Sequence, residues 1–140
     1  MRAEARMPGD FLDSNVLVYA FTDDLRAPTA QALLERGCRI SVQGLNEFTN
    51  VARRKLGKSW AEIRSHIAAI RTVCPLILPI SVATHEAAVQ LAERYGFAMF
   101  DALVVASALE AQSATLWSED MQDGMMVEGR LRIADPFRTR

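Results

Sequence analysis

Short apolar runs alternate along the chain with longer stretches in which apolar residues recur at helical spacing. Between the short runs, apolar residues return every three or four positions, which is typical of amphipathic helices. Strands that alternate with helices favour a parallel sheet covered on both faces. We therefore predict an α/β fold, a three-layer α/β/α sandwich around a short and mainly parallel central sheet. The predicted strands cover residues 10–13, 39–42, 76–80, 115–117 and 131–134.

The expected helices have recognisable ends. Pro28 suits a first helical turn, and Ser59 with Glu62 forms a capping box. The helix that opens at Ser81 should turn Val82, Val89 and Ala92 inward. The last helix is apolar on nearly every side, which predicts a fully buried helix. The expected helices cover residues 16–21, 29–36, 44–56, 59–73, 81–96 and 100–109.

Length and composition fit one ordinary globular domain. The chain has 140 residues, 50% of them hydrophobic and 24% charged. We expect a short arm at residues 1–9 and a single domain at 10–140, with either Met1 or Met7 as the natural start. No apolar run reaches the length of a membrane span, and the first residues lack the apolar core of a secretory signal. These features predict a cytoplasmic protein with no membrane partner.

The formal net charge is −1, whereas a protein that holds nucleic acid by charge alone is normally basic. Any contact with nucleic acid should therefore be local, brief or bridged by metal ions. The densest basic run is Arg53, Arg54 and Lys55. These side chains either hold RNA phosphates or form a solvated helix end whose cations suit the helix dipole. The sequence leaves both interpretations open.

Four acidic residues lie where a parallel sheet usually places its functional site, outside the carboxyl ends of the strands. Asp13 ends one predicted strand, Asp120 lies just past another, and Glu47 lies in the helix after the second strand. Asp101 lies in the first turn of the apolar helix. Each acid also has a structural explanation as a helix cap, a first-turn acid, a solvated helix residue or a loop acid. Taken singly, neither interpretation is favoured.

Taken together, the four acids indicate a metal centre. Crowded carboxylates repel one another and raise one another's pKa values, so a nearby cation is needed to keep them ionised. Hard oxygen ligands select Mg²⁺ or Mn²⁺. Such a centre activates water and stabilises a phosphoryl transition state.

The segments that carry these acids resemble, in order, the motifs of the PIN-domain nucleases. Chain length and the lack of a further domain make the sequence most similar to the VapC-type toxins of bacterial toxin–antitoxin pairs. The resemblance extends from residue 10 to about residue 137. The matching segments are DSNVLVYA at 13–20, NEF at 46–48, FDALVVASA at 100–108 and SED at 118–120.

This resemblance implies a Mg²⁺- or Mn²⁺-dependent endoribonuclease that forms a homodimer and is inhibited by a cognate antitoxin. By the same resemblance, Asp13 and Asp101 would be direct metal ligands. Glu47 and Asp120 would hold bound water or a second ion, and one such water would attack phosphorus in line. Helices like those at 29–36 and 59–73 bind antitoxin and form the dimer in the family, although their apolar stripes suit an intramolecular core equally well.

Three neighbouring polar residues would orient the acids. Ser14, Asn15 and Ser118 are the expected hydrogen-bond donors. The fourth acidic position is open, because Asp120 and Asp123 lie in the same loop and either side chain can turn inward. The spacing from Ser118 favours Asp120.

Two other functions compete with a nuclease. A phosphatase or phospho-acceptor domain of similar architecture needs a lysine late in the chain, but the only lysines are Lys55 and Lys58. A non-catalytic binding module for nucleic acid or protein would tolerate loss of the acids, yet all four positions are acidic. The residues do not decide between RNA and DNA, and the resemblance favours RNA.

Overall fold

The computed structural model describes residues 9–138. Most of the expected arm, with the choice between Met1 and Met7, lies outside the described residues. Gly9 is buried, and a Cβ atom there would approach the Arg39 side chain to 2.8 Å. The chain therefore enters the sheet close against its neighbouring strand, at a position where only glycine fits without displacing that side chain.

Six helices and six strands follow one another in the described part of the chain. The strands are β1 (Phe11–Leu12), β2 (Arg39–Ser41), β3 (Leu76–Leu78), β4 (Thr115–Trp117), β5 (Met126–Val127) and β6 (Leu131–Ala134). The helices are α1 (Ser14–Tyr19), α2 (Ala27–Glu35), α3 (Val42–Arg54), α4 (Trp60–Val73), α5 (Val82–Tyr95) and α6 (Met99–Glu110). Among residues 9–138, none of these helices has both the length and the apolar character needed to cross a membrane.

The strands form one sheet in the order β3-β2-β1-β4-β6-β5. All neighbouring pairs are parallel except β5 with β6, which confirms a mainly parallel sheet. The short strand β5 was not expected. Glu128 and Gly129, both with positive φ, are the central residues of the turn from Val127 to Arg130 that leads into β6. Because β5 has only two residues, it leaves no alternating pattern in the sequence.

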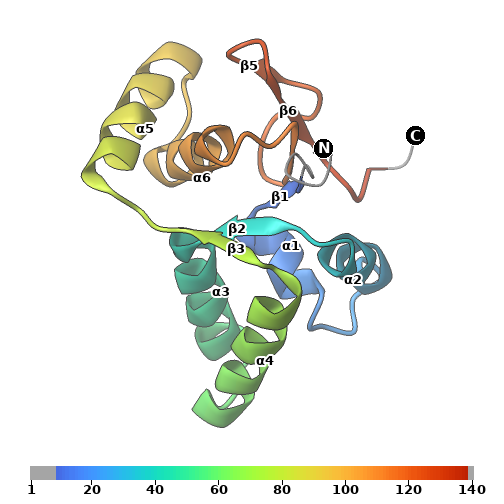
Figure 1. The fold of residues 1–140 in the computed structure, drawn as a ribbon. Coiled ribbons are helices and arrows are strands. Elements are labelled where there is room, and N and C mark those ends of the chain that lie inside the picture. The colour runs from blue at the N-terminus through green and yellow to red at the C-terminus, as the bar shows by residue number, and fades with distance from the viewer. Residues whose placement is uncertain (1–8, 139–140) are drawn as a thin grey trace, which may run out of the picture.

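Helices cover both faces of the sheet, which confirms the layered architecture. Figure 1 shows α5 and α6 on one side of the strands, with α1 to α4 on the other. Neighbouring residues of β1 supply both layers, since Phe11 packs in the core under α5 and α6 while Leu12 packs in the core under α1 to α4. This alternation fixes the orientation of β1, and with it the direction of the residue that follows.

The expected inward face of α5 was wrong at two of its three positions, since Ala92 packs against the core but the two valines do not. Val82 and Val89 are 76% and 46% exposed. The buried positions are Thr84, Ala88 and Leu91, which lie on one helical stripe. Small residues at the contact let α5 pack closely against α6. This close packing sets the rotation of α5, although burying the larger valines would remove more apolar surface from water.

The first turn of α6 also differs from the expectation of a fully buried helix. Residues Ala102–Ala108 are all buried, but Phe100 is 62% exposed. The enclosed stretch begins only after Asp101, so the first turn lies at the open end of the core. Hydrophobicity alone could not show this, because the sequence is apolar on both sides of Asp101.

Val82→Ser tests the rotation of α5. Because Val82 is exposed, the substitution should change the free energy of unfolding by no more than about 0.5 kcal/mol. Urea denaturation of the two proteins measures this difference. A loss of several times that size would mean that Val82 is buried after all.

Candidate active site

Asp13 follows β1 and is fixed at the start of α1. Its Oδ1 atom accepts a hydrogen bond from the Ser14 backbone N–H at 2.7 Å, so it is the N-cap of this helix. Its Oδ2 atom accepts from the Ser118 hydroxyl at 2.8 Å and from the Asn15 amide at 3.4 Å. The side chain is only 4% exposed. A buried carboxylate is thus held at the carboxyl edge of the sheet by three donors.

Burial and the charges of neighbouring acids change the pKa values of Asp13 and Asp101. Burial raises the pKa of Asp13 from 3.8 to about 6, and the charges of Glu47 and Asp101 add to the rise, while hydrogen bonds to the carboxylate oppose it. Burial also raises the pKa of Asp101, with further contributions from Asp120 and Glu47. Because the charges of Glu47, Asp101 and Asp120 contribute to the raised pKa values of Asp13 or Asp101, the four acids form one electrostatic group.

The first turn of α1 also contacts Glu47 and Asp120. The Ser14 hydroxyl donates to Glu47 Oε1 at 3.1 Å, and the Asn15 amide donates to Asp120 Oδ2 at 3.1 Å. Asn15 Oδ1 in turn accepts from the Glu119 backbone N–H at 3.2 Å. The three polar residues named from the sequence as orienting donors therefore contact the acids in this structure.

Asp123 lies in a different environment from Asp120. Its carboxylate accepts from the Asp135 backbone N–H at 2.8 Å and lies 3.6 Å from the Arg138 guanidinium. These contacts attach the β4–β5 loop to the segment after β6. The charge of Asp120, in contrast, contributes to the raised pKa of Asp101. Of the two candidates for the fourth position, the structure brings Asp120 to the group of acids.

The group is not a closed cation cage. Within residues 9–138, no three Asp, Glu, His or Cys side chains gather closely enough to hold a metal ion as they stand. The donor chemistry nevertheless fits a hard divalent cation, because the group offers several carboxylates, two of them with a pKa raised by burial and like charge. A cation among these carboxylates would offset both effects.

A network beside the acids was missed by the sequence analysis. Glu119 accepts from the Tyr19 hydroxyl at 2.8 Å and from Arg26 Nε at 2.9 Å. The Arg26 guanidinium also lies 5.0 Å from the centroid of the Tyr19 ring. Glu119 directly precedes Asp120, so this network fastens the loop that carries the fourth acid. No local pattern indicates this network, because Glu119 is about a hundred positions from Tyr19 and Arg26.

The predicted basic run divides in the structure. Arg53 and Arg54 border a surface pocket beside α3, whereas Lys55 is the exposed C-cap residue of this helix and does not line that pocket. The dipole interpretation therefore suits Lys55, and the first two positions remain candidates for substrate contact.

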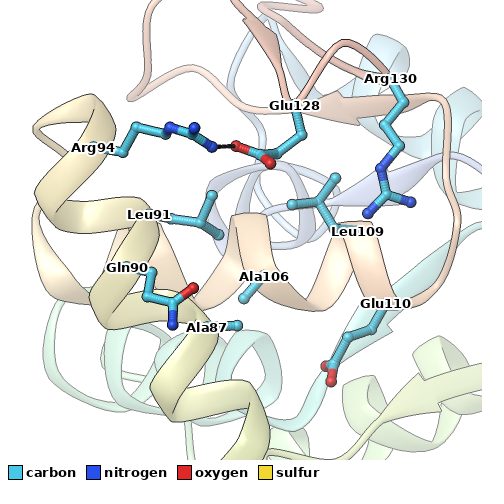
Figure 2. Close-up of a pocket in the computed structure, with 9 residues that line it drawn as sticks. All are labelled: Ala87, Gln90, Leu91, Arg94, Ala106, Leu109, Glu110, Glu128 and Arg130. Carbon is cyan, nitrogen blue, oxygen red and sulfur yellow. Dashed lines mark hydrogen bonds and ion pairs between the residues drawn. The ribbon is translucent and has the colours of Figure 1, made fainter.

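Another pocket, of about 260 Å³, lies between α5, α6 and the β5–β6 turn. Figure 2 shows its apolar floor, which includes Leu91 and Leu109, and its rim, where Arg94 and Glu128 form an ion pair at 2.7 Å. It lies along the second half of α6, whereas Asp101 is in the first turn. This pocket is therefore distinct from the group of acids.

Comparison with known protein families decides the classification. The model of the PIN domain matches residues 11–122. The chain belongs to the PIN-domain family. The matched region includes all four grouped acids and ends one residue before Asp123. No curated protein matches the sequence significantly.

Solved structures show the same PIN fold. A chain of a toxin–antitoxin complex from Klebsiella pneumoniae has a TM-score of 0.72 at 21% identity, and the match covers 94% of this chain and 100% of that one. The sarcin–ricin loop cleaving toxin VapC20 of Mycobacterium tuberculosis gives 0.64 at 19% identity, covering 80% and 92%. VapBC2 of Rickettsia felis, bound to a promoter DNA fragment, gives 0.63 at 21% identity, covering 89% and 98%.

Proposed function

We propose that this PIN-domain protein is a metal-dependent endoribonuclease and the toxin of a type II toxin–antitoxin pair. The observation that carries the proposal is the group of four acids at the carboxyl edge of the sheet. Burial and mutual repulsion raise the pKa of Asp13 and of Asp101, which a divalent cation would reverse. PIN-domain nucleases generally use such a cation, and solved relatives of this fold include toxins.

In this proposal the four acids divide into metal ligands and residues that orient water. Asp13 and Asp101 would hold Mg²⁺ or Mn²⁺, and the cation would supply Lewis acidity and a water of lowered pKa. Glu47 and Asp120 would orient water at the phosphodiester, where a carboxylate can accept its proton. Hydrogen bonds to Asp13 set the direction of its oxygens before substrate arrives.

The proposed partners follow from the same assignment. The substrate is RNA, and a cognate antitoxin protein would inhibit the enzyme in the cytoplasm. The apolar stripes of α2 and α4 are largely used inside the chain, as the burial of Leu33, Leu34, Ile63 and Ile70 shows. A homodimer would therefore have to use other apolar side chains, and Val82 and Val89 on α5 are exposed.

The proposal is tested by incubating the purified protein with single-stranded RNA in Mg²⁺ or Mn²⁺, with parallel samples in EDTA. Cleavage products should appear only with the metal ion, because the acids need a cation to activate water. Cleavage that survives EDTA would contradict the mechanism. A protein that binds RNA but never cuts it would instead be a non-catalytic module.

A further inference from the structure

A polar pocket of about 380 Å³ lies on the outer side of α3 and the start of α4. Its most unusual member is Trp60, which is 51% exposed. The remaining lining is hydrogen-bonding or cationic, so it does not resemble an apolar protein-docking groove. The lining residues are Asn46, Thr49, Asn50, Arg53, Arg54 and Trp60.

The exposed ring of Trp60 is held in place. Trp60 is the first residue of α4, whose start is fixed by the capping box of Ser59 and Glu62. The Arg53 guanidinium lies 5.1 Å from the ring centroid and donates a hydrogen bond to the Lys58 carbonyl at 3.1 Å. A large aromatic surface is thus presented to solvent in a fixed position, beside a cation.

The pocket adjoins the group of acids through α3. Asn46 directly precedes Glu47, and Asn50 and Arg54 lie three and seven positions after it, on the same side of the helix. From Glu47 to Arg53 the helix rises about 9 Å, at 1.5 Å per residue. A chain bound at the acids would therefore reach the pocket with a neighbouring nucleotide.

We propose that this pocket binds an unpaired base of the RNA substrate, next to the phosphodiester that is cut. The base stacks on Trp60, the amides of Asn46 and Asn50 meet its polar edge, and Arg54 contacts a phosphate. Unpaired RNA is recognised in this way, by stacking on aromatic rings and by hydrogen bonds to base edges. The inference rests on the proposed function, since it requires an RNA substrate.

The test measures binding in EDTA, which separates recognition from cleavage. The probes are a short oligoribonucleotide without secondary structure and a chain of equal length with abasic units. Trp60→Ala should weaken binding of the first probe about tenfold, within the range for base–aromatic stacking, and leave the second unchanged. Trp60→Phe, which keeps a stacking ring, should restore most of the affinity. Arg54→Gln should weaken both probes, because its contact is to phosphate.

Arg71→Gln is the matched control, because Arg71 is an exposed arginine in the last turn of the same helix α4. It should bind both probes as the wild type does. Equal weakening of both probes by Trp60→Ala, or no weakening of either, would overturn the base site. If Trp60-dependent binding is found but the wild type never cuts RNA, the base site holds and the proposed nuclease function fails.

Discussion

Asp13→Asn should reduce metal-dependent RNA cleavage by at least about a hundredfold, a typical cost of removing one preorganised electrostatic group from an active site. The substitution keeps the shape of the side chain and an oxygen for the Ser14 backbone N–H, so the helix cap survives. It removes the negative charge that would face the metal ion. Initial rates on a labelled RNA, in Mg²⁺ and in Mn²⁺, measure the loss.

Asp123→Asn is the matched control for this experiment. Asp123 lies in the same loop as Asp120, but its carboxylate holds the segment after β6 through the Asp135 backbone N–H. An asparagine oxygen can accept the same bond, so the cleavage rate should stay close to that of the wild type. If Asp123→Asn is the inactive variant and Asp13→Asn is active, the assignment of the acids is wrong.

The sequence predicted the layered fold because its main signals are local. Apolar periodicity, the Ser59–Glu62 capping box and the glycine after α5 each act within a few residues, and all agree with the structure. The errors arise where tertiary packing decides. Close packing of α5 on α6 buries a different face of α5 from the one that its valines indicate. The β5–β6 pairing depends on a strand too short to show periodicity.

Less of the candidate site than of the fold could be predicted from the sequence. Position at strand ends and family motifs indicated the four acids, but only the spacing from Ser118 favoured Asp120 over Asp123. That distinction depends on contacts between distant parts of the chain, such as the bond from Asn15 to Asp120. The Glu119 network was missed for the same reason. The pocket at Trp60 was missed because it forms only where the turn between α3 and α4 brings Trp60 beside Arg53.

The raised pKa of Asp13 has a consequence for stability that can be measured without substrate. Between pH 3.8 and about pH 6, the folded protein holds a proton on Asp13 that the unfolded chain has lost. Stability linked to this group is therefore complete below pH 3.8 and is lost as the pH rises through 6. Ionised Asp13 is thus a cost that the fold tolerates at neutral pH, as expected for a residue kept for function.

Asp13→Asn should therefore become more stable relative to the wild type as the pH rises, when both are kept in EDTA. A pKa shift from 3.8 to about 6 corresponds to about 3 kcal/mol, at 1.36 kcal/mol per unit. The lost carboxylate acceptor for Ser118 offsets about 1 kcal/mol of this at every pH. The free-energy difference between variant and wild type should thus grow by about 2–3 kcal/mol between about pH 4 and about pH 7.5.

Urea denaturation at the two pH values measures this growth, and Asp123→Asn is again the control. Added Mn²⁺ should reverse the order of stability at neutral pH, because a ligand that binds only the folded state stabilises the protein that retains its binding site. If the difference in free energy of unfolding between Asp13→Asn and wild type stays constant from acid to neutral pH, ionisation of Asp13 does not destabilise the folded chain. The electrostatic argument for a cation at the four acids would then lose its basis.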